Sequence, residues 1–179
     1  MNNQQGKRAE DIFSVRITQD YIFRARDLGA KWPVSDYYVE IDNEEEPLSF
    51  IVQVKSSSRG YNAKGNFRIS VSRERANQLA SYRAPTFIAG VDIEKEMVYL
   101  SSLYRKRATG ISTLSTIFAL SEQDQETSRI NLQNLRSEVK KFWNDTNAKI
   151  IKENFKSTLP CHQSKKSKPG ARNWSQKLR

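Results

Sequence analysis

Residues 50–55 read Phe50-Ile51-Val52-Gln53-Val54-Lys55, the clearest strand pattern in the chain. Aromatic and β-branched residues favour a strand, and the run Ser56-Ser57-Ser58-Arg59-Gly60 that follows is typical of a turn. Because successive side chains of a strand point to opposite faces, Gln53 and Lys55 share one face and Val52 and Val54 share the other. Lysine is rarely buried without a partner, so this polar face needs an explanation.

Residues 36–41, Asp36-Tyr37-Tyr38-Val39-Glu40-Ile41, predict a second strand just upstream. If the two strands pair as an antiparallel hairpin across residues 42–49, Asp36 and Glu40 lie on the same side as Gln53 and Lys55. Two carboxylates, an amide and an ammonium would then converge on one surface of the sheet. The same pattern also fits a simpler interpretation, in which Gln53 and Lys55 end an edge strand in water. In that case Lys55 and Asp36 form at most an exposed salt bridge, which contributes little.

The remaining pattern predicts an α/β protein with a central mixed sheet flanked by helices. Apolar residues at helical spacing predict a first helix over residues 5–18, a short crossing helix over residues 73–81, and a long helix or helix pair over residues 127–155. Further strands are expected at residues 21–25, 66–70, 86–93 and 97–103. Helices at both ends of a run of strands are typical of a layered α/β architecture.

The charge of the chain is concentrated near its C-terminus. The formal net charge is +10 over 179 residues. After Ser157 there is no acidic residue, and the basic ones there are Lys165, Lys166, Lys168, Arg172, Lys177 and Arg179. We therefore expect one domain over residues 1–157 and a disordered basic tail over residues 158–179.

Several classes of protein are excluded by composition. The sequence has no apolar run long enough to span a membrane, and its polar first residues lack the apolar stretch of a secretory signal. The single cysteine, Cys161, rules out an internal disulfide framework and a cysteine-based zinc site. The single histidine, His162, is predicted to be inert in the tail. We expect a cytoplasmic protein.

Asp36 and the run Gln53-Val54-Lys55-Ser56 resemble the D…QxK variant of the PD-(D/E)XK nuclease signature, as found in restriction-type endonucleases of the Mrr kind. Gly6-Lys7-Arg8-Ala9-Glu10 at the first helix and Pro85-Thr86-Phe87-Ile88 after the crossing helix extend the likeness. In this order and spacing the motifs are similar to the bacterial family known as domain of unknown function 4365. The resemblance covers about residues 6–155 and implies a restriction-endonuclease-like core.

The resemblance also implies roles for the polar residues. Mg²⁺ or Mn²⁺ would be held by Asp36, the side-chain oxygen of Gln53 and the backbone carbonyl of Val54, since hard cations take oxygen ligands. Lys55 would orient the attacking water and stabilise charge on the phosphate. Glu10 would hold a metal-bound water or the lysine. A further carboxylate, Glu40, would be either a ligand or a support for Lys55. Glutamine in place of a carboxylate removes one negative charge and weakens the metal site.

The function implied is a metal-dependent endonuclease acting on DNA, with RNA not excluded, in a bacterial defence or restriction setting. A homodimer or a larger defence complex would supply targeting, because the domain is small. Candidate contacts to nucleic acid are basic residues in loops and at a helix start, namely Arg59, Lys64, Arg73, Arg105, Lys106 and Arg107. Each of these also fits a plain solvated loop or helix. The alternative function is a catalytically weak or inactive nuclease-like subunit that binds nucleic acid or a protein partner.

Overall fold

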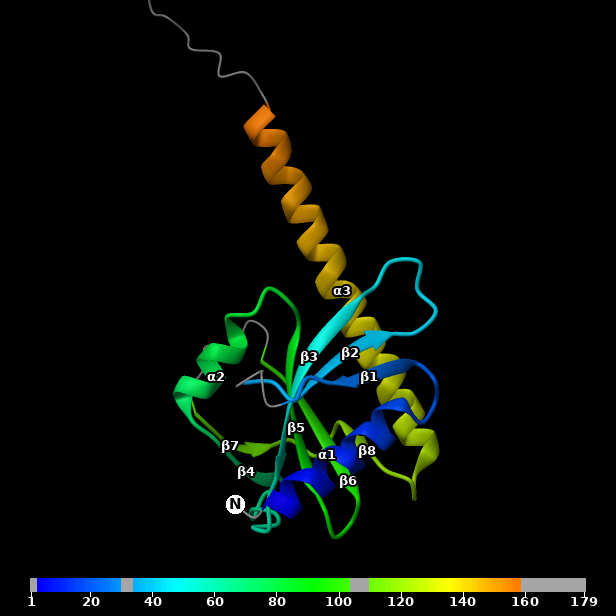
Figure 1. Cartoon of the computed structure of the whole chain (residues 1–179), viewed down its shortest axis with the longest axis vertical. Helices are drawn as coiled ribbons and strands as arrows, with labels where there is room; N and C mark the ends of the chain where they lie inside the picture. Colours follow the sequence, from blue (N-terminus) through cyan, green and yellow to red (C-terminus); the bar gives the residue numbers. More distant parts are fainter. Residues whose placement is uncertain (1–2, 30–33, 104–109, 159–179) are drawn as a thin grey trace, which may run out of the picture. The chain divides into compact units, whose positions relative to one another are not determined.

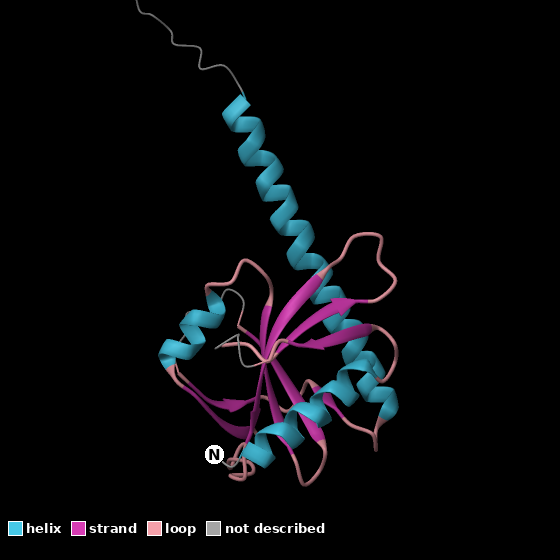
Figure 2. Ribbon diagram, in the orientation of Figure 1, coloured by secondary structure: helices cyan, strands magenta, loops and turns pink. Residues whose placement is uncertain are grey.

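The computed structural model describes residues 3–29, 34–103 and 110–158, which form helices at both ends of the described chain and strands between them (Figures 1 and 2). The helices are α1 (Asn3–Thr18), α2 (Arg73–Ala80) and α3 (Gln125–Thr158). The strands are β1 (Phe23–Asp27), β2 (Tyr37–Ile41), β3 (Ser49–Ser56), β4 (Phe67–Val71), β5 (Thr86–Asp92), β6 (Met97–Ser102), β7 (Ile111–Leu114) and β8 (Ala119–Leu120).

Six strands form the central sheet, in the order β1-β2-β3-β5-β6-β8. β3 runs parallel to β5, whereas the other neighbours are antiparallel, so the sheet is mixed as predicted. The expected hairpin is present, because β2 pairs with β3 in antiparallel register. β3 therefore lies inside the sheet, and the interpretation of residues 50–55 as an edge strand is wrong.

The two faces of the central sheet are covered differently. One face packs against α1 and α3 around Phe13, Val39, Phe50, Val91 and Leu135, which are all fully buried. The other face is covered by α2 and by a two-stranded ribbon of β4 and β7, and its core includes residues such as Phe67, Leu79, Ile88 and Leu114. Lys55 and Gln53 belong to this second face, because the apolar side chains of their neighbours Val52 and Val54 join the first.

The structure corrects several predicted details. Tyr21 has a positive φ of 54° and belongs to a turn, so the first strand begins two residues later, at Phe23. The strand at residues 66–70 is found as β4, but it pairs with β7 in the separate ribbon. The two short strands β7 and β8 were not predicted. The closing segment is one helix, α3, and not a pair.

The chain divides into two compact units, residues 1–145 and 146–179, with α3 continuous through residue 145 to Thr158. The tail predicted from residue 158 onward lies almost entirely outside the described residues, so the predicted boundary remains a prediction. Cys161, His162 and the cluster Arg105-Lys106-Arg107 also lie outside them. No helix within the described residues is both long and apolar enough to cross a membrane.

Candidate functional site

Asp36 lies at the open end of the β2–β3 hairpin, where β2 begins beside the second half of β3. The register pairs Val52 with Tyr37, and the Asp36 N–H donates to the Val52 carbonyl at 3.0 Å. Two residues of one strand thus oppose one residue of the other, which is the arrangement of a β-bulge. The bulge turns the Asp36 carboxylate onto the backbone of β3, where Oδ2 accepts a hydrogen bond of 2.6 Å from the Val54 N–H. The Asp36 carboxylate is therefore fixed against Val54, the residue between Gln53 and Lys55 in the strand.

Gln53 is fully buried, and neither atom of its amide has a hydrogen-bond partner among the described residues. Buried polar groups are nearly always paired, and one left unpaired costs about 1–3 kcal/mol. An unpaired donor and an unpaired acceptor on the strand that carries Lys55 therefore mark a place where a water or an ion is expected. Oxygen from this amide is also a ligand type that Mg²⁺ accepts.

Two carboxyl groups near the open end of the hairpin, those of Asp36 and Glu10, have raised pKa values. Burial raises the pKa of Asp36, although the Val54 hydrogen bond and the positive charges of Lys55 and Arg75 act in the opposite direction. Burial, and after it the neighbouring charge of Asp36, raises the pKa of Glu10 on α1. The Tyr37 hydroxyl donates to the Glu10 carbonyl at 3.1 Å, which ties α1 to β2 at this point. Two carboxyl groups with raised pKa values side by side would be stabilised as anions by a cation.

Two basic side chains approach the same carboxylate from different elements. Lys55 on β3 is half-buried, and it makes no ion pair of 4 Å or less with any residue that the structure describes. Arg75 on α2 is also half-buried, and its charge acts on Asp36. Arg75 is not among the site residues predicted from the sequence. Its relation to Asp36 could not be found without the position of α2 over the sheet.

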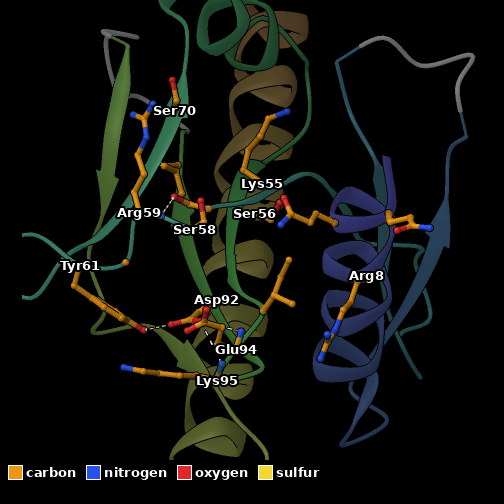
Figure 3. A pocket seen from close by; sticks show the side chains of 16 residues that line it. Arg8, Lys55, Ser56, Ser58, Arg59, Tyr61, Ser70, Asp92, Glu94 and Lys95 are labelled. Atoms are coloured by element: carbon orange, nitrogen blue, oxygen red, sulfur yellow. Dashed lines mark hydrogen bonds between the residues drawn. The ribbon is translucent and has the colours of Figure 1, made fainter. Parts of the chain in front are cut away.

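Lys55 also lines an open cleft of about 960 Å³ beside α1 (Figure 3). The run from Ser56 to Tyr61 forms one wall, and Asp92 to Lys95 close the far end. Asp92 is buried and accepts a hydrogen bond of 2.7 Å from the Tyr61 hydroxyl. Basic side chains outnumber acidic ones along the cleft, with Arg8, Lys55, Arg59 and Lys95 against Asp92 and Glu94. A cleft of this charge suits an anionic ligand.

The other predicted residues have different positions. Glu40 is paired with Ser49, at the opposite end of the hairpin from Lys55, and its carboxylate contacts Arg26 at 3.1 Å. The structure therefore does not bring Glu40 to Lys55, and we leave it out of the site. Arg59 lines the cleft. Lys64 and Arg73 are exposed and do not line it.

The donor set for a metal is small. Within the described residues there is no group of three or more His, Cys, Asp and Glu side chains placed to hold one. The predicted ligands are one carboxylate, one amide oxygen and one backbone carbonyl. Because the N–H and C=O of a strand residue point to the same side, the Val54 carbonyl lies on the edge where its N–H meets Asp36. Together with the oxygen of the unpaired Gln53 amide, these are oxygens of the type that a hard divalent cation takes as ligands.

Comparison with known proteins gives little beyond this geometry. No protein-family model matches the sequence, and no curated protein matches it. Among solved structures the chain is similar to a bacterial homing endonuclease, I-Ssp6803I, at 16% sequence identity and a TM-score of 0.49. The match covers 83% of this chain and 98% of that one. A likeness of this extent bears on neither activity nor substrate, so the function is argued from the residues of the site.

Proposed function

We propose that this chain is a metal-dependent nuclease that hydrolyses phosphodiester bonds of DNA. The observation that carries the proposal is the hydrogen bond that fixes the Asp36 carboxylate on the backbone of Val54. Val54 stands in the strand between Gln53, whose buried amide is unpaired among the described residues, and Lys55. The resemblance of these positions to the D…QxK nuclease signature supplies the reaction. The basic cleft that begins at Lys55 supports an anionic polymer as the substrate.

Asp36, Gln53 and the Val54 carbonyl would hold Mg²⁺ or Mn²⁺. The metal, when bound, lowers the pKa of a coordinated water and polarises the phosphate. Lys55 orients the attacking water and balances the negative charge that develops on the phosphate oxygens. Glu10 would hold a metal-bound water or the ammonium of Lys55, and burial, with the neighbouring charge of Asp36 after it, raises the pKa of Glu10. The positive charge of Arg75 favours the ionised form of Asp36, against the larger effect of burial.

The setting that we propose is bacterial defence or restriction, in the cytoplasm. The catalytic unit is small, so a second copy of the chain or a protein partner supplies the choice of target. RNA as the substrate follows from the same chemistry, because the cleavage site acts on the phosphodiester group that both polymers share.

The test compares Asp36→Asn with Asp42→Asn, two substitutions at opposite ends of the same hairpin. Asp42 pairs with Arg24 at 2.7 Å and stands outside the proposed site. We expect wild type and Asp42→Asn to cut plasmid and oligonucleotide DNA when Mg²⁺ or Mn²⁺ is present. Asp36→Asn should cut neither kind of DNA with either metal, although it should still bind DNA. Calorimetric titration with Mn²⁺ should show binding to wild type that Asp36→Asn abolishes. Equal cleavage by Asp36→Asn and wild type would contradict the proposal.

One observation favours a second function, that of a nuclease-like subunit without catalytic power. The proposed ligand set holds a single carboxylate, and fewer anionic ligands bind a divalent cation less tightly. In the same assays this alternative predicts DNA binding by wild type and Asp36→Asn alike. It also predicts no cleavage with either metal and no Mn²⁺ binding.

A further inference from the structure

A second groove, of about 510 Å³, lies along the β4–β7 ribbon next to the cleft. The two hollows share Arg59, Ile69 and Ser70, so one surface leads from Lys55 onto the ribbon. Figure 3 shows the Arg59 side chain extended toward Ser70 on β4. The groove is lined by Arg59, Arg68, Ile69, Ser70, Val71, Gly110, Ile111, Ser112 and Thr113, and no acidic residue is among these described residues.

The two faces of the ribbon have opposite character. On β4, Phe67, Ile69 and Val71 are buried, whereas Arg68 and Ser70 between them are exposed. Arg68 pairs with Thr113 of β7, so the guanidinium and a hydroxyl share the outer face. Ser112 adds another exposed hydroxyl. This face therefore offers hydroxyl groups and positive charge without a carboxylate among the described lining residues, and such groups contact phosphate and sugar in nucleic-acid complexes.

Local hydrogen bonds fix the position of Arg59 between the two hollows. The Arg59 N–H donates to the Ser57 hydroxyl at 3.1 Å, and the Arg68 N–H donates to the Gly60 carbonyl at 2.9 Å. Gly60 has a φ of +60°, a conformation that glycine adopts without strain. The loop after β3 thus folds back onto β4, and Arg59 is held beside the ribbon.

We propose that the outer face of the β4–β7 ribbon, with Arg59 and Arg68, binds the sugar–phosphate backbone of the nucleic acid and leads it to Lys55. This inference rests on the proposed function and adds the surface that holds the substrate. The five residues of β4 span about 16 Å, which matches roughly five base-pair steps of a duplex. A two-stranded ribbon also has a width that the major groove of DNA admits.

The experiment measures binding without metal, by fluorescence anisotropy of labelled duplex and single-stranded DNA in EDTA at several salt concentrations. The variants are Arg68→Ala, the double variant Arg59→Ala/Arg68→Ala, and the charge-keeping Arg68→Lys. The matched control is Arg129→Ala, because Arg129 is also exposed but lies on α3, which covers the other face of the sheet. Circular dichroism checks that each variant is folded.

A plot of the logarithm of the DNA-binding constant against the logarithm of the salt concentration has a negative slope. Each lost phosphate contact reduces the magnitude of that slope by about one unit. We therefore expect the magnitude of the slope to fall by about one unit for Arg68→Ala and by about two units for the double variant, with weaker binding to every sequence. Arg68→Lys and Arg129→Ala should keep the wild-type slope. Equal affinity and slope for Arg68→Ala and Arg129→Ala would overturn the inference. Because this binding experiment contains no metal, such a result would contradict the role of the ribbon and would not test cleavage that depends on Asp36. Conversely, if the ribbon binds DNA but the chain does not cleave it with metal, only the proposed activity is contradicted.

Discussion

The two ends of the β2–β3 hairpin carry acidic groups whose pKa values are shifted in opposite directions. At the turn, Glu44 contacts Lys140 at 2.8 Å and also pairs with Arg136, and hydrogen bonds from these two cations lower its pKa. At the open end, burial raises the pKa of Asp36, and its nearest basic groups do not offset that effect. Glu44 is thus a carboxylate held in ion pairs, whereas Asp36 is a buried carboxylate that accepts a backbone hydrogen bond and makes no ion pair of 4 Å or less with a described residue.

The largest difference is expected between two lysines, Lys55 at the open end of the hairpin and Lys140 of α3, which contacts Glu44 at the turn. We expect Lys55→Met to lower kcat for DNA cleavage by roughly 10²–10³-fold, because a positive group that stabilises transition-state charge is lost. Lys140→Met removes a cation of α3 that contacts Glu44 at the turn, and it should leave kcat unchanged. The measurement is single-turnover cleavage at saturating Mg²⁺. Similar losses in both variants would show that Lys55 acts on the fold and not on the reaction.

Substitutions at Gln53 should change stability and activity in different directions. Gln53→Met replaces the unpaired amide with an apolar side chain of similar shape, so we expect the free energy of unfolding in EDTA to rise by about 1 kcal/mol. The same variant should bind Mn²⁺ more weakly and cut more slowly. Gln53→Glu should bind Mn²⁺ more tightly, since it adds a negative charge. Urea unfolding and calorimetry measure the two effects, and a destabilised Gln53→Met would mean that the amide is paired in the folded chain.

The dependence of stability on pH should have opposite signs at the two ends. A raised folded-state pKa at Asp36 contributes stability at low pH, and that contribution is lost as pH rises through the folded pKa. A lowered folded-state pKa at Glu44 contributes stability above the ordinary value of 4.5, and it is lost as pH falls through the folded pKa.

Urea unfolding in EDTA, from about pH 3 to about pH 8, checks both signs. Asp36→Asn should gain stability relative to wild type as pH rises, whereas the deficit of Glu44→Gln should shrink as pH falls. Both effects should be small, and the one at Glu44 should weaken in high salt because its partners are near the surface. The same direction of change in both variants would contradict the contrast between the ends.

Much of the fold was predictable from residues 36–56, and the reason is local. The β-branched runs place β2 and β3 within a residue of the predicted bounds, and strand alternation puts Gln53 and Lys55 on one face. Tyr21 was misassigned because aromatic residues favour strands even where the backbone turns. β7 and β8 are only four and two residues long, too short to show a period. Strand alternation assigned Glu40 to the correct face of the sheet. It does not show how far apart two residues lie along neighbouring strands, and Glu40 pairs with Ser49, away from Lys55.

The α/β class and the hairpin followed from the sequence, because they depend on periods of two and 3.6 along the chain. The set Asp36, Gln53 and Lys55 came from the resemblance to the D…QxK signature and stays a prediction. Only the tertiary structure decided which groups lack partners. The burial of Gln53, the bulge that turns Asp36 onto Val54, and the approach of Arg75 all depend on elements that are distant in sequence. Pairing and desolvation are properties of the packed layers, and they change a polar pattern on a strand into a candidate site.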